Sequence, residues 1–265
     1  MNGPLLRYLW RRSVSPCLAC ALAPILIGVV AGGVWPEYRA QARAFGSLFK
    51  FAMNLMRSDL LAPDSASFFF QLPFVHPLTI LALLLAVAVP TLSLPAAARG
   101  RGSLDLLLAS GLTRRSLVAT TTCAALPFAI LVGCAPLLGV WLGATISHAT
   151  GDLDFPRFAR VAFAAALLGF FFTGVAQLLS VLCDDLFGAT WRLAAFVLWS
   201  LLAEIAGTIW RDGHALKYLS PFGYYEPAQV LAGVGDYPRD CAVLAAGGAL
   251  AFVLALGAAE RRRSA

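Results

Sequence analysis

The chain has 265 residues, of which 60% are hydrophobic and only 13% are charged, and its mean hydropathy is +0.78. About a quarter of the residues of a soluble domain are charged, so this composition excludes a soluble globular protein and predicts a chain that faces lipid. The formal net charge is +6, and membrane topology accounts for it without a nucleic-acid partner.

Six stretches are apolar enough and long enough to cross a bilayer, which takes about 20 residues in a helix. We therefore expect an all-α polytopic membrane protein that forms a single transmembrane domain over residues 1–265. The predicted spans are 14–34, 74–95, 116–145, 159–182, 193–210 and 241–259.

The segment Leu5–Arg12, just before the first span, interleaves leucine and tryptophan with arginine. This pattern is typical of an amphipathic segment that binds anionic membrane lipid, or of a positive flank that orients the span. A cleaved signal peptide is the alternative interpretation. The apolar run at 14–34 is longer than the ~7–15 residues of a signal-peptide core, so we expect an uncleaved anchor.

The basic residues predict the orientation, because Lys and Arg are retained on the cytoplasmic side of a membrane. With the N-terminus inside, the inner segments hold 11 basic and four acidic residues, whereas the outer segments hold nine of each. We therefore expect both termini in the cytoplasm and the chain in a plasma membrane, such as a bacterial inner membrane.

The first outer loop, 35–73, is long and has its own apolar periodicity. Apolar residues recur at intervals of three or four, at Tyr38, Ala42, Phe45, Phe49, Ala52 and Met56. This spacing predicts an amphipathic helix in the loop, which lies on the outer membrane surface or covers the spans below it.

A short helix is expected between the second and third spans, on the cytoplasmic side. Ser103 is a favourable N-cap, and Asp105 suits the positive end of the helix dipole. Gly111 is a natural end for the helix, and Thr113 can cap the next one. The apolar surface of the helix consists of Leu104, Leu106, Leu107 and Leu108, and the arginines that bracket it include Arg114 and Arg115. Such a surface suits either a groove on a soluble partner or the lipid headgroups.

The segment from Arg99 to Arg115 resembles the first cytoplasmic loop of ABC-2 type transporter permeases. That loop reads Glu-Arg-x-x-Gly-Thr-Leu-Asp/Glu-x-Leu-Leu-x-x-Pro-[Ile/Val]-Ser-Arg. The matching positions are Arg99, Gly102, Ser103, Leu104, Asp105, Leu107, Leu108, Thr113 and Arg114. The leading Glu of the pattern falls on Ala98 and its Pro on Gly111. The segment Leu219–Pro227 is similar to the Ser-Pro-Phe-x-Tyr segment of the same permeases, so the resemblance extends over nearly the whole chain.

This resemblance implies that the chain is one half of a transmembrane transporter, most often an exporter. A second permease chain, identical or different, would complete it. An ATPase subunit would bind through a coupling helix at about Ser103–Ser110. The absence of the Glu at position 98 puts in doubt any charge contact that the family makes there.

The sequence contains no motif for nucleotide hydrolysis. A P-loop needs a lysine after a glycine, and the two lysines of the chain, Lys50 and Lys217, follow Phe49 and Leu216. We therefore expect no enzymatic activity, cofactor or metal on this chain, with ATP and Mg²⁺ bound by the partner ATPase. His76, His148 and His214 are expected on the outer side without ligand spacing, as interfacial histidines rather than a metal site.

Glu204 is the single acidic residue inside a predicted span, nearer its outer end. An acid within a membrane is a candidate for function, although Glu204 could also pair with an outer arginine or reach the interface. It leaves open a second hypothesis, a secondary carrier that works without a partner and couples transport to an ion. A third hypothesis is an intramembrane enzyme or a membrane protein that does not transport.

Overall fold

The computed structural model describes residues 2–48, 60–62, 64–94 and 96–261 of the chain. In this part all regular structure is helical. The elements are, in order, α1 (Gly3–Leu48), α3 (Ala66–Phe70), α4 (Leu72–Val75), α5 (Pro77–Leu92), α6 (Ala96–Gly100), α7 (Leu104–Ala109), α8 (Arg114–Ile146), η2 (Thr150–Asp152), α9 (Phe155–Leu182), α10 (Leu186–Ile209), η3 (Arg211–Leu219), η4 (Pro221–Tyr224), α11 (Pro227–Ala232) and α12 (Tyr237–Arg261).

Six regions are long and apolar enough to cross a membrane, and they confirm the predicted fold class. They are α1, the α3–α5 region, α8, α9, α10 and α12. The chain is therefore a polytopic membrane protein. α10 begins at Leu186, earlier than the predicted 193, because Asp185 caps it: its Oδ1 accepts from Gly188 N at 2.6 Å. α5 ends at Leu92, and position 95, the predicted end of the second span, lies outside the described residues.

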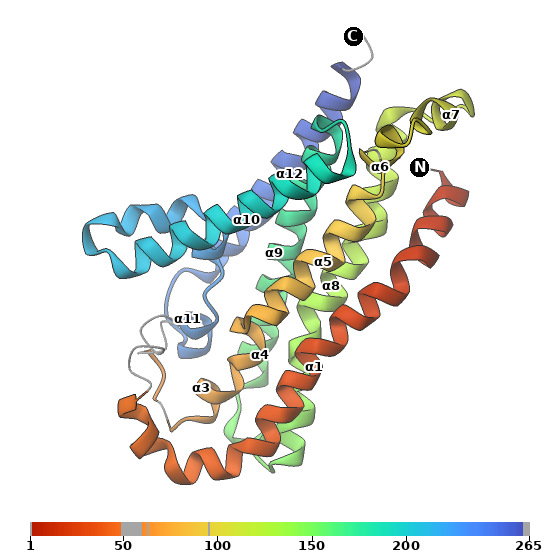
Figure 1. Cartoon of the computed structure of the whole chain (residues 1–265). Coiled ribbons are helices and arrows are strands. Elements are labelled where there is room, and N and C mark those ends of the chain that lie inside the picture. Colours follow the sequence, from red (N-terminus) through yellow and green to blue (C-terminus); the bar gives the residue numbers. More distant parts are fainter. Residues whose placement is uncertain (1, 49–59, 63, 95, 262–265) are drawn as a thin grey trace.

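The first helix differs from the prediction, because it does not end at residue 34, the predicted end of the first span. α1 is continuous from Gly3 to Leu48 and so includes the Leu5–Arg12 segment, the first span and the start of the predicted outer helix. The extension packs on α3, where the Tyr38 and Phe69 ring centroids are 4.4 Å apart. Pro36 lies inside α1, and Figure 1 shows the last part of the helix turned away from its first part. Phe49, Ala52 and Met56 lie outside the described residues.

Glycines bring the long helices into close contact. A Cβ at Gly28 or Gly32 of α1 would overlap the backbone of Gly139 or Gly143 of α8. In the same way, a Cβ at Gly174 of α9 would overlap the backbone of α12. Lipid tails are as apolar as leucine, so helix association in a bilayer relies on such small residues, which allow backbones to approach.

α10 diverges from the bundle, and the chain after it turns back towards the centre (Figure 1). The rings of Phe196 of α10 and Phe172 of α9 are 6.2 Å apart, and Phe172 is also 5.4 Å from Phe222 of η4. Phe172 lies 17 residues into α9, about 25 Å from the start of that helix. Phe222 of η4 therefore packs on α9 well away from the start of that helix.

Both described ends of the chain lie at the same end of the bundle as α6 and α7 (Figure 1). The backbone N–H of Asn2 donates to Thr120 Oγ1 at 3.4 Å, and Arg115 forms an ion pair with Glu260 near the end of α12. We call this the α7 end of the molecule. The structure thus groups the termini with the segment that the charge pattern predicts to be cytoplasmic.

Two adjacent glycines test the contact between α1 and α8. Gly32→Ala is expected to destabilise the protein by about 1–3 kcal/mol, because the new methyl group overlaps the backbone of Gly143. Gly33→Ala is the matched control, since a Cβ at Gly33 meets no atom within 4 Å. Thermal unfolding in detergent measures both, and equal midpoints for the two variants would contradict the close packing.

Candidate functional site

The predicted coupling helix forms, but it is shorter than expected. After α6, Gly102 turns the chain with a φ of +67°, and α7 covers Leu104–Ala109. Ser103 occupies the N-cap position of α7, as predicted, but it does not cap the helix with its side chain. Its side chain accepts no hydrogen bond from the helix, and its hydroxyl instead donates to Ala98 O at 3.2 Å. Ser103 therefore holds the turn between α6 and α7 together.

The four leucines of α7 do not form one exposed surface. Leu104 is buried in a cluster with Leu9 of α1 and Leu117 of α8. Leu107 and Leu108 pack partly on the same cluster, whereas the side chain of Leu106 is 74% exposed. Asp105 is exposed beside it. α7 therefore has one face attached to the bundle and one face, centred on Leu106, that is free to contact another molecule.

The connection from α7 to the third span is short, and its two ends are as predicted. Gly111 ends the helix in the left-handed conformation, with a φ of +88°. Thr113 caps α8, because its Oγ1 accepts from Ser116 N at 3.1 Å. A displacement of α7 would therefore act directly on the first turn of α8.

Arginines join the elements of the α7 end. Arg99 donates to Val181 O at 3.3 Å and to Cys183 O, so it caps the negative end of α9. Arg115 forms its ion pair with Glu260, and Arg114 is half-buried beside Leu104. These side chains tie α6, α8, α9 and α12 together behind α7.

Glu204 is half-buried on α10, and its backbone carbonyl accepts a hydrogen bond from the Thr208 hydroxyl at 2.9 Å. It is therefore part of the helix that diverges from the bundle and not of the α7 end. The two sites that the sequence suggests lie apart in the structure.

A buried ion pair, which the sequence analysis missed, lies after α10. Lys217 Nζ pairs with Glu226 Oε1, and the two side chains are only 6% and 8% exposed. Glycines make room for the lysine, because a Cβ at Gly207 or Gly223 would collide with the backbone of Lys217. One signal was present in the sequence: Lys217 is one of only two lysines and is followed closely by Glu226.

The Ser-Pro-Phe segment connects this ion pair to the bundle. Ser220 caps η4, with its Oγ accepting from Phe222 N at 3.1 Å. The phenol of Tyr225 donates to Phe74 O at 3.2 Å, and burial raises the pKa of Tyr225, so that it remains a donor. Arg157 Nη1 donates to Leu231 O at 2.7 Å. The segment 217–231 is thus anchored to α4 and α9 as well as to α10.

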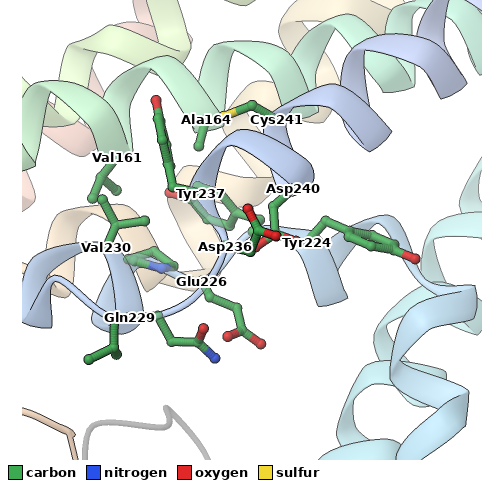
Figure 2. Close-up of a pocket in the computed structure, with 13 residues that line it drawn as sticks. Val161, Ala164, Tyr224, Glu226, Gln229, Val230, Asp236, Tyr237, Asp240 and Cys241 are labelled. Carbon is green, nitrogen blue, oxygen red and sulfur yellow. The ribbon is translucent and has the colours of Figure 1, made fainter.

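A small pocket next to this segment contains three carboxylates. Figure 2 shows Asp236 and Asp240 on one side, with the Glu226 side chain pointing away from them. Among the described residues no group of three or more His, Cys, Asp or Glu side chains is arranged to hold a metal ion. His76 caps α5 through Nδ1, which accepts from Leu78 N at 3.2 Å, so it has a structural role.

Comparisons of the chain with protein-family profiles, with characterised proteins and with solved structures return no match. The fold itself defines the class: the chain is a polytopic membrane protein with six long apolar helices.

Loss of one partner of the buried ion pair is expected to be costly. Lys217→Met leaves the Glu226 carboxylate buried without its cation, and we expect a loss of about 3–5 kcal/mol in unfolding free energy. The double variant Lys217→Met/Glu226→Leu is expected to recover most of this loss, because it leaves no charge behind. Thermal unfolding in detergent measures both variants.

The control is the exposed ion pair of Arg39 and Asp152, whose N–O distance is 3.3 Å and whose side chains are 63% and 48% exposed. Arg39→Ala is expected to cost about 1 kcal/mol or less, because water screens the pair. If Lys217→Met costs no more than Arg39→Ala, the pair of Lys217 and Glu226 is not buried as described.

Proposed function

We propose that this chain is the permease subunit of an ATP-driven transporter, most simply an exporter, whose ATPase is a separate subunit. Two permease chains would pair, and each would bind one ATPase subunit that carries the ATP and the Mg²⁺. The observation that carries the proposal is α7, with its exposed face around Leu106 and its buried face on α1 and α8.

The geometry of α7 suits the transmission of force. A partner that grips Leu106 and Asp105 would push on a helix whose opposite face is packed on Leu9 and Leu117. Because Thr113 caps α8 directly after α7, the push would reach the third span without a flexible linker. ATP-driven closure of two ATPase subunits would thereby shift α1, α5 and α8 and alternately open a path between two permease chains.

The charge of the α7 end supports a cytoplasmic location. Basic residues of the described chain gather at this end: Arg7, Arg11, Arg12, Arg99, Arg101, Arg114, Arg115, Arg192 and Arg261. Lys and Arg are retained on the cytoplasmic side, where a soluble ATPase would be available. With this end in the cytoplasm, α7 lies on the side of the membrane where the resemblance to ABC-2 permeases expects the coupling helix.

An ion-coupled carrier that needs no ATPase is the second candidate, and one observation favours it. Such a carrier needs buried ionisable groups, and the pair of Lys217 and Glu226 is buried. Purified chain in vesicles that hold a pH-sensitive dye distinguishes the two. Dissipation of a proton gradient without ATPase, and its loss in Glu226→Gln protein whose thermal unfolding shows that it remains folded, would favour the carrier.

The exposed leucine of α7 gives the direct test of partner binding. Leu106→Asp is expected to abolish co-purification of a P-loop ATPase from the membranes of the protein's own cells, identified by mass spectrometry. A buried carboxylate without a partner at such a contact weakens binding by at least about 2 kcal/mol, roughly 30-fold. Leu106 is 74% exposed, so the substitution leaves the fold intact.

Val234→Asp is the matched control, because Val234 is also exposed, at 47%, but follows α11, away from α7. It is expected to leave co-purification unchanged. Equal ATPase recovery with Leu106→Asp and with the unmodified chain would refute the coupling role of α7.

Labelling of the same two positions tests the orientation. Leu106→Cys is expected to react with a membrane-impermeant maleimide only in inside-out vesicles, and Val234→Cys only in intact cells. The unmodified chain, with its six cysteines in or beside the spans, is the blank. The opposite pattern would exclude a cytoplasmic ATPase at α7.

A further inference from the structure

A groove of about 570 Å³ lies on the side of the bundle at the α7 end. One face of α5 forms its wall, Arg12 of α1 and Arg101, which follows α6, contribute positive charge, and the start of α10 closes the other side. This volume is within the range of protein sites that bind small molecules. The groove is separate from the Leu106 face of α7, since no α7 residue lines it.

The groove is polar at one end and apolar along its length. Its apolar wall consists of Leu85, Ala88, Val89 and Leu92, which extends about 10 Å along α5 away from the α7 end. Phe187, at the start of α10, is 80% exposed at its rim. The apolar wall therefore extends towards the membrane interior, and the charged residues Arg12 and Arg101 lie at its α7 end.

The charged layer favours an anion. Arg101 uses Nε to donate to Ala97 O at 3.1 Å, and Arg12 uses Nη1 to donate to Tyr8 Oη at 3.1 Å. Each guanidinium has five N–H donors, so both retain donors for a ligand. Asp185 also lines the groove, but its Oδ1 accepts from Gly188 N at 2.6 Å to cap α10. The groove thus has one more positive than negative side chain.

We infer that this groove binds one anionic glycerophospholipid. The phosphate lies between Arg12 and Arg101, and an acyl chain lies along Leu85, Val89 and Leu92. Arginine pairs with phosphate through charge-assisted hydrogen bonds, and the apolar wall takes up a hydrocarbon chain that is already in the bilayer. The inference requires only that the chain spans a membrane, so it stands or falls independently of the ATPase partner.

A second copy of the chain fits the groove less well. The exposed apolar faces available for pairing include Leu18–Val34 of α1 and Val243–Leu254 of α12, and neither stretch contains an acidic residue. A helix of this kind in the groove would cover Arg12 and Arg101 without an anion. A phospholipid supplies the negative charge and the apolar chain in one molecule.

Native mass spectrometry of the delipidated full chain tests the proposal. The chain is titrated with phosphatidylglycerol or phosphatidylcholine of the same acyl composition. We expect one phosphatidylglycerol to bind in preference to phosphatidylcholine. Arg12→Gln/Arg101→Gln is expected to weaken phosphatidylglycerol binding roughly 30-fold, and Arg101→Gln alone about fivefold, without a change for phosphatidylcholine.

Arg7→Gln/Arg11→Gln is the matched control, since it also removes two positive charges, both from α1 near Arg12, but neither residue lines the groove. It is expected to change phosphatidylglycerol binding by no more than about twofold. Unchanged binding in the Arg12/Arg101 variant, or an equal loss in the control, would overturn the site. So would displacement of the lipid by inorganic phosphate alone, or a bound mass equal to a second copy of the chain.

Discussion

No water is available inside a bilayer to satisfy a backbone amide or a side-chain charge, and the rest of the structure follows from this constraint. Every described span is helical. Five of the six are continuous helices, the second consists of α3, α4 and α5, and most of the charged side chains lie at or near helix ends. Because lipid offers no hydrophobic drive for helices to associate, contact depends on backbones that approach closely at glycines, as at Gly28 and Gly139. At the α7 end, outside the apolar part of the spans, arginines, helix caps and turns can be exposed to water.

The side chains of Lys217 and Glu226 are almost completely buried, and their pairing has a consequence for the architecture. A buried charge is tolerated only with its partner, so the pair joins η3 to the start of α11, while the backbone of Lys217 packs on Gly207 of α10. Phe222 links this segment to Phe172 of α9, and α9 ends under the cap supplied by Arg99. One helix therefore connects the anchored segment to the α7 end.

Local chemistry made much of the fold predictable. The number of long apolar helices, the end at Gly111 and the cap at Thr113 depend on residues close in the sequence. The continuity of α1 was missed because the uncharged apolar stretch ends before Glu37, whereas the helix continues and packs through Tyr38 on Phe69. The orientation of Leu104 and Leu106 depends on neighbours from α1 and α8, and the ion pair of Lys217 and Glu226 depends on a fold-back of the chain. Neither the orientation of these leucines nor the ion pair produces a periodic pattern in the sequence.

The central claim is that α7 transmits force from a separate ATPase. A photo-crosslinking amino acid at position 106, activated in intact cells, tests this contact at the residue that carries it. The account predicts a covalent product between this chain and a protein that contains a P-loop, stronger than any product from position 234. Products with lipid alone, or with proteins outside the cell, would contradict it.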